Sequence, residues 1–481
     1  MAEMNSTTDN NKSNLSSKNA EQSEQQLIIK APEEGLVETT SKLDGVKQSA
    51  PVKDGHLTNA LIFAILSCTI GSSFQFGYHI GCINVPADFI KAWLRESHGN
   101  ATAISNAEIN STWGIAVGIF AIGGMVSGIM VGVVADRLGR RQALLYNNAL
   151  AMIAAVLMTS AKYVHVFWLI VIGRFIIGVN AGLNSGLAPM YLTEISPANL
   201  RGSIGSLAQL TVTISILVSQ IIGLPFLLGT DTLWPGIFAF TLVSAELELI
   251  NAEAVAARSQ PQVNMLAMLK APLLWPLVLT VFMMLSQQLS GINAAMFYSN
   301  EIFKKAGLEG QWPNYATILM GAINVLMTVV SVYMVERVGR RNLQLIGLSG
   351  MCVTTAMIAI SMLLSKSVSW FSFMSIIFVL LFVISFATGP GSIPWFFVNE
   401  VFPANALGNA ISVAVVTNWG TNALVGLGYP FLQDLLNLYS FFVFTVMLVL
   451  FTVFAFKFLP ETKNKPLEEI HAEMEQRRKF G

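Results

Sequence analysis

The motif Asp136-Arg137-Leu138-Gly139-Arg140-Arg141 occurs twice in this chain, because Glu336-Arg337-Val338-Gly339-Arg340-Arg341 repeats it 200 residues later. A second motif, Glu194-Ile195-Ser196-Pro197-Ala198-Asn199, recurs as Glu400-Val401-Phe402-Pro403-Ala404-Asn405 after 206 residues. Two matches at nearly one offset predict two similar halves. Parallel halves related by an axis along the membrane normal, with a site between them at mid-depth, are a transporter architecture. A solvated charge cluster would explain either arginine patch alone, but not its repetition.

The composition places the chain among membrane proteins. Of its 481 residues, 53% are hydrophobic and only 12% are charged, whereas a soluble domain carries about 25% charged residues. The net charge is zero, so it indicates neither a nucleic acid nor an acidic partner. The three cysteines lie in apolar stretches without the spacing of metal ligands, and no nucleophile–base pair, nucleotide loop or cofactor motif is present.

Eleven stretches reach the length of about 20 apolar residues that a membrane-crossing helix needs. They begin near Leu57, Trp113, Ala143, Phe167, Ser203, Leu273, Ala316, Leu343, Phe371, Val401 and Phe441. Residues 1–56 are polar and lack aromatic side chains, so we expect a disordered tail.

The arginine patches predict the orientation. Loops rich in Lys and Arg face the cytoplasm, so both patches, the amino-terminal tail and the carboxy-terminal tail 461–481 are expected there. The segment between spans one and two then lies outside. Its sequon at Asn100 is a candidate for glycosylation, whereas the sequon at Asn110 adjoins the start of span two, where an enzyme would reach it poorly.

A twelfth candidate, the sixth along the chain, is too short. Leu233–Ala245 is apolar, but Glu246 and Glu248 follow it. Thirteen helical residues rise about 20 Å, against a hydrocarbon core of about 30 Å. We therefore expect halves at 57–250, with a strained sixth span, and at 271–460, joined by a short cytoplasmic linker at 251–270.

The polar side chains inside the later spans are mostly amides, hydroxyls and indoles rather than ionisable groups. Polar groups within spans face the bundle interior or a cavity, and an amide both donates and accepts, as a hydroxyl does. The pattern suits a neutral polyol and not a phosphate, carboxylate or cation. Gln287, Gln288 and Asn293 form the strongest group, and Gly291 between them allows the helix to break. An isolated amide could instead only join helices.

Further motifs carry a family resemblance from about residue 57 to 465. They are Gly71–Tyr78, Gly173-Arg174, Pro189-Met190-Tyr191, Gln287–Asn293, Gly389–Trp395, Asn418-Trp419 and Pro460–Lys463. The chain resembles the sugar porters of the major facilitator superfamily, most closely the facilitative glucose transporters. The resemblance implies an all-α membrane protein of two pseudo-symmetric six-helix halves in the plasma membrane. It also implies facilitated diffusion of a neutral hexose, with D-glucose favoured by Gln288-Leu289-Ser290, and no cofactor.

The resemblance also assigns residue roles. For sugar binding it implies Gln209, Gln287, Gln288, Asn293, Asn324, Trp395, Asn418 and Trp419. For an inner latch of salt bridges it implies Asp136, Arg137, Arg140, Arg141, Glu194, Arg201, Glu336, Arg337, Arg340, Arg341 and Glu400. The chain departs from the family at Ala387, where a Glu is usual, and at Leu407, the equivalent of Arg201.

Two alternatives remain open. His79 stands where proton-coupled sugar porters have Asp and uniporters have Asn. It titrates near neutral pH, so proton coupling through His79 competes with a neutral hydrogen-bonding role. The sixth span is also truncated, and most of the family's central cytoplasmic domain is missing, which allows a non-transporting or impaired isoform.

Overall fold

The computed structural model describes residues 56–97, 105–197, 200–242, 268–270, 272–305, 307–364, 368 and 370–480. The predicted tail, the sequon at Asn100 and most of the linker lie outside the described residues. The side chain of Arg201 lies outside them as well. The predictions for these parts stay predictions.

The described residues contain eleven helical segments that are long and apolar enough to cross a membrane, which confirms the number predicted from the sequence. In the first half they are α2 (Asn59–Cys68) with a π-helical turn (Thr69–Ser73) and α3 (Phe74–Gly81), α5 (Asn106–Leu138), α6 (Arg140–Val164), α7 (Trp168–Ile195) and α8 (Arg201–Ile222). In the second half they are α11 (Leu274–Gln288) with α12 (Ile292–Lys305), α13 (Trp312–Val338), α14 (Arg340–Leu364), α15 (Trp370–Thr388) with α16 (Ile393–Val401), α17 (Ala404–Leu436) and α18 (Ser440–Phe458). Shorter helices are α4 (Ala87–Ser97), α9 (Pro235–Ala239), a 3₁₀ turn (Asn437–Tyr439) and α19 (Leu467–Phe480).

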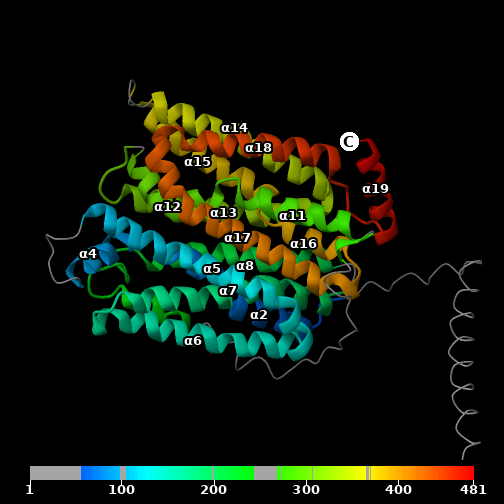
Figure 1. Ribbon diagram of the computed structural model, residues 1–481, viewed down its shortest axis with the longest axis horizontal. Coiled ribbons are helices and arrows are strands. Elements are labelled where there is room, and N and C mark those ends of the chain that lie inside the picture. The colour runs from blue at the N-terminus through cyan, green and yellow to red at the C-terminus, as the bar shows by residue number, and fades with distance from the viewer. Residues whose placement is uncertain are drawn as a thin grey trace, which may run out of the picture. The chain divides into compact units, whose positions relative to one another are not determined.

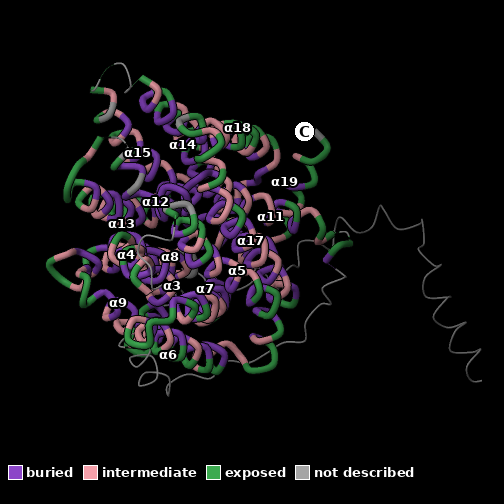
Figure 2. The backbone as a smooth tube through the Cα atoms, turned by 60° about the vertical axis from the view of Figure 1, so that its left-hand side comes forward, coloured by how far each residue is buried: buried purple, intermediate pink, exposed green. Residues whose placement is uncertain are grey.

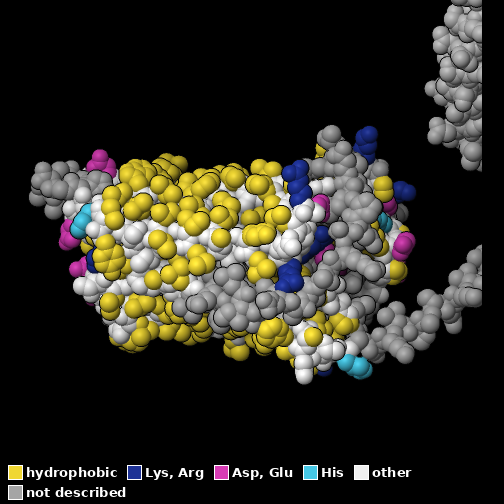
Figure 3. Space-filling model, turned by 90° about the horizontal axis from the view of Figure 1, so that it is seen from below, with side chains coloured by type: hydrophobic (Ala, Val, Ile, Leu, Met, Phe, Trp, Pro, Cys, Tyr) yellow, Lys and Arg dark blue, Asp and Glu magenta, His cyan; other side chains and the backbone are white. Residues whose placement is uncertain are grey.

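The long helices run side by side along the bundle, with the first half below and the second half above in Figure 1. The two halves meet where α5 packs against α17 and where α8 packs against α13. Figure 3 shows a broad hydrophobic face between two ends where charged side chains gather. This all-helical arrangement confirms the predicted fold class.

We call the end that carries Arg137–Arg141 and Arg337–Arg341 the arginine end. The opposite end, which carries α4, is the α4 end (Figure 1).

Burial differs strongly among the helices (Figure 2). The span formed by α11 and α12 is 78% buried over its most apolar window, and α7 is 72% buried, whereas α18 is only 22% buried. α7 and α11–α12 therefore form the interior of the bundle, and α18 turns most of its apolar side chains outward.

Small residues bring α5 and α17 into close contact. A Cβ added at Gly124 would lie 2.3 Å from the Trp419 ring, and one at Gly128 would lie 2.9 Å from Val415. The backbone N–H of Gly132 donates to Ser412 Oγ at 2.8 Å. Glycines at a spacing of four allow such close approach, and this seam joins the two halves.

The sixth apolar stretch begins with α9, a helix of five residues that packs on α6, and helix resumes at Thr241 after a turn at Phe240. The Tyr78 hydroxyl donates to the Ile237 carbonyl at 2.7 Å, and the Tyr78 ring stacks on Phe240. α9 therefore covers the part of span one that lies nearer the α4 end. Residues 243–267 lie outside the described part of the chain, so a crossing by this stretch stays a prediction.

Candidate functional site

A central cavity lies between the two halves. Its volume is about 70 Å³. Seven of the eight residues predicted to bind sugar line it, namely Gln209 on α8, Gln287 and Gln288 on α11, Asn293 on α12, Asn324 on α13, Trp395 on α16 and Asn418 on α17. The structure thus brings together side chains from six helices that are far apart in the sequence.

The predicted break in span seven is present. α11 ends at Gln288 and α12 begins at Ile292, and Gly291 between them has φ +89°. This backbone conformation favours glycine. The break lets Asn293 donate to Gln288 Oε1, although the two residues are five apart and would diverge on a regular helix. Both amides then face the cavity.

The amides of α11 are held by α17 and by the bend between α15 and α16. Gln287 Nε2 donates to the carbonyls of Pro390 and Gly391 at 2.7 and 3.0 Å. Asn418 Nδ2 donates to Gln287 Oε1 at 2.6 Å, and Gln288 Nε2 donates to Asn418 Oδ1 at 2.8 Å. The network satisfies these amides in advance, so a ligand hydroxyl would meet groups that are already oriented.

Two other amides retain a free acceptor. Asn324 Oδ1 and Asn422 Oδ1 are buried and have no hydrogen-bond partner within the described residues. Buried polar atoms are normally paired, and both residues line the cavity. These oxygens are available to accept hydrogen bonds from a bound hydroxyl.

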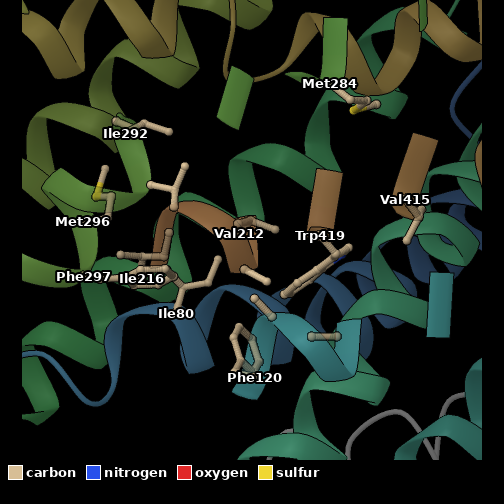
Figure 4. Close-up of a cluster of buried hydrophobic side chains, with 14 of the residues drawn as sticks. Ile80, Phe120, Val212, Ile216, Met284, Ile292, Met296, Phe297, Val415 and Trp419 are labelled. Carbon is tan, nitrogen blue, oxygen red and sulfur yellow. The ribbon is translucent and has the colours of Figure 1, made fainter. Parts of the chain in front are cut away.

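Apolar side chains from both halves lie beside the amides. Ile80, Val212 and Ile216 come from the first half, and Ile292 and Met296 come from the second half (Figure 4). Eight amide or hydroxyl residues and eight apolar or aromatic residues line the cavity together with Gly391, so polar groups are about as numerous as apolar ones. The apolar side chains can contact the C–H faces of a ring, while the amides bind its hydroxyls.

Trp419, the eighth residue predicted to bind sugar, is not among the residues that line this cavity. It is 1% exposed, and its Nε1 donates to Ser185 Oγ at 3.0 Å across the two halves. Its ring lies edge-on to Phe120, 5.2 Å away, in the space that Gly124 leaves open. Trp419 therefore joins the halves in this conformation.

Two polar lining residues, Thr213 and Asn422, were not predicted from the sequence. Each lies four residues beyond a predicted one, Gln209 and Asn418 respectively. Residues four apart share a helix face, so this spacing is the sequence signal for both.

His79 lies outside the cavity, fully buried in the first half. Its Nε2 is 2.8 Å from Thr241 Oγ1, and its carbonyl accepts from Arg174 Nη1 at 2.8 Å. The Arg174 guanidinium also lies over the Phe120 ring at 4.3 Å. His79 therefore connects span one, α7 and the residues after α9.

The charged motifs at the arginine end form two similar clusters, one in each half. Arg140 lies 2.9 Å from Glu194 and 3.8 Å from Asp136. In the second half the equivalent pairs are Arg340 with Glu400 at 2.9 Å and with Glu336 at 3.3 Å. These four ion pairs each join residues of the same half.

The chain after α18 braces the second cluster. Glu461 accepts from the backbone N–H groups of Arg340 and Arg341 at 2.9 and 3.2 Å, at the start of α14. Thr462 Oγ1 donates to Glu400 Oε2. Negative charge at a helix N-terminus is stabilising, so this segment holds α14 in place.

Polar contacts join the halves at the α4 end. Asn84 Nδ2 donates to the Met296 carbonyl at 2.9 Å and to Ser299 Oγ at 2.6 Å. Lys304 Nζ lies 2.8 Å from Asp88 Oδ2. The two halves are therefore held together between the cavity and the α4 end.

Comparison with known proteins identifies the family. Residues 64–252 and 244–474 match the model of the sugar (and other) transporter family. The chain belongs to this family. It is a multi-pass membrane transporter and not an enzyme, as the family match and the eleven apolar spans together indicate.

Two relatives of this sugar transporter cover most of its length. It is 48% identical over 473 residues to facilitated glucose transporter protein 1 of Caenorhabditis elegans, covering 88% of this chain and 92% of the relative. It is 41% identical over 459 residues to solute carrier family 2, facilitated glucose transporter member 3 of Ovis aries, covering 86% and 92%.

The fold also resembles a solved transporter structure. The proton:xylose symporter XylE bound to 6-bromo-6-deoxy-D-glucose superimposes with a TM-score of 0.72 at 25% identity, covering 86% of this chain and 98% of that one. This likeness places the chain in the major facilitator superfamily.

Proposed function

We propose that the protein carries a neutral hexose, D-glucose, across the plasma membrane by facilitated diffusion. The observation that carries this proposal is the cavity lining, in which none of the described residues is ionisable. Amides that both donate and accept match the hydroxyls of a sugar, whereas a charged solute would be left without a counter-charge. The names of the two relatives, both facilitated glucose transporters, support the same substrate.

In the proposed mechanism the two halves rotate about the central site. The contacts at the α4 end, Asn84 with Ser299 and Asp88 with Lys304, hold that side closed. The arginine clusters would form the inner latch when the arginine end closes. A ligand shifts such an equilibrium only through its differential affinity for the two states. We place the arginine end and both tails in the cytoplasm, following the positive-inside tendency.

Uptake of radiolabelled D-glucose into proteoliposomes tests the proposal, with L-glucose as the matched control. We expect saturable uptake of D-glucose, because the oriented amides recognise the positions of its hydroxyls. L-glucose has the same composition and polarity, so equal uptake of the two would refute a stereospecific sugar site.

Proton-coupled symport through His79 is the second candidate. Its support is the burial of a titratable ring next to Arg174. We favour uniport, because His79 does not line the cavity and is hydrogen-bonded to Thr241. Adding a protonophore, which collapses the pH gradient, separates the two candidates. A uniporter keeps its glucose uptake, whereas a symporter no longer accumulates glucose. The His79→Asn variant should behave like the native protein if uniport is right.

A non-transporting or impaired isoform is the third candidate, supported by the short apolar stretch Leu233–Ala245, which Glu246 and Glu248 follow. We propose that the shortened stretch lowers stability and transport rate. Uptake by this chain is compared with uptake by a version in which the family's missing block is restored. Normal surface expression of this chain with no uptake, and recovery in the restored version, would favour the inactive isoform.

A further inference from the structure

A groove separate from the central cavity lies between the last turn of α18 and one face of α19. Its volume is about 660 Å³. Three cations, Lys457, Lys465 and Arg477, and two carboxylates, Glu469 and Glu473, line it. The lining therefore carries an excess of positive charge.

The charged groups of the groove hold one another in place. Glu473 accepts from Lys465 Nζ and from Arg477 Nε, both at 2.7 Å, and Lys465 lies 3.4 Å from Glu469. The contact between Arg477 and Glu473 is made by Nε of Arg477 and not by its terminal nitrogens. Oriented donors on fixed side chains suit an anionic group with several oxygens.

The charge and the position of Lys457 indicate which kind of ligand the groove binds. It forms no ion pair with any residue that the structure describes. It lies on the last turn of α18, on the same face as the exposed Val446, Leu450 and Val453, which precede it by eleven, seven and four residues. An apolar stripe that faces lipid therefore ends at an unpaired cation, at the level where headgroups lie.

We propose that this groove binds the phosphate headgroup of an anionic phospholipid, whose acyl chains lie along the apolar stripe of α18. Lys457 and Arg477 would contact the phosphate, and Lys465 would stay paired with Glu469 and Glu473. Basic side chains at the end of a span attract anionic lipids. A free phosphate could use the same cations, but it would gain nothing from the stripe.

The test uses the full chain in detergent, titrated with short-chain phosphatidylserine, with bound lipid counted by native mass spectrometry. We expect Lys457→Gln to weaken the tightest lipid binding about fivefold, the effect of one basic residue near an anionic headgroup. Lys479→Gln is the matched control, because it removes the same charge from α19 outside the groove. The control should bind lipid as the native chain does.

Three results would overturn the proposal. Equal binding by Lys457→Gln and the native chain would remove the site. Equal weakening by Lys479→Gln would leave only a general effect of charge. Displacement by inorganic phosphate as effective as by phosphatidylserine would assign the groove to a soluble anion. Thermal unfolding of Lys457→Gln without lipid should equal that of the native chain, since no described ion pair is lost, and this measurement separates lost binding from lost folding.

Discussion

Replacing Gln288 by Leu tests the central site most directly. The side chain is 6% exposed, donates to Asn418 and accepts from Asn293. In the sugar-bound state we expect the Gln288 amide to exchange these two hydrogen bonds for two with sugar hydroxyls, donating one and accepting the other. Each neutral hydrogen bond contributes about 1 kcal/mol, so two lost bonds cost about 2 kcal/mol, or about 30-fold in uptake efficiency.

The assay is initial-rate uptake of D-glucose into proteoliposomes, with the amount of inserted protein measured in parallel. Gln344→Leu is the matched control. Gln344 is also fully buried, but it lies on α14 away from the cavity, and its amide has no hydrogen-bond partner among the described residues. We expect the control to keep native uptake. Native efficiency in Gln288→Leu would refute the assignment of this amide to the sugar.

Other predictions concern the backbone and the charged clusters. Gly291→Ala should lower the free energy of unfolding by about 1–2 kcal/mol, because alanine disfavours the positive φ at this position. The added Cβ would also lie 2.8 Å from the Phe444 ring, and this clash should increase the loss. Glu400→Gln should cost about 1.5–3 kcal/mol in thermal unfolding, because Arg340 loses charged hydrogen bonds. Burial raises the pKa of Glu473, but hydrogen bonds from its lysine and arginine partners outweigh it and hold the pKa below 4.5. The docking of α19 should therefore persist at neutral pH and weaken as the pH falls through that lowered pKa. The rate of proteolytic cleavage within α19, measured at a series of pH values, should rise as the pH falls.

The membrane fold could be predicted because it depends on composition and length. A stretch of apolar residues crosses lipid whatever it packs against, so eleven spans were evident before any contact was known. The amides of α11 were predictable for a related reason, since a polar group inside such a stretch must face inward. Gly291 marked the break, because a position with positive φ favours glycine.

Other parts could not be predicted, because they depend on partners far away in the sequence. The position of Trp419 is fixed by the space at Gly124, some 300 residues earlier, and no local pattern records that pairing. Glu461 binds backbone N–H groups of α14, and backbone donors leave no signature in the side-chain sequence. The resemblance predicted an inner latch for the outward-open state, and this stays a prediction, because the α4 end is the side held closed here.

The ion pair between Asp88 and Lys304 gives the protein a one-sided sensitivity to ionic strength. The two side chains are 72% and 45% exposed, so dissolved salt screens their attraction. The pairs of Arg340 with Glu336 and Glu400 lie within the second half, so screening them does not separate the two halves. Concentrated salt should thus weaken the contact between the halves at the α4 end and leave the arginine end unchanged. The population of molecules that are open at the α4 end should therefore increase.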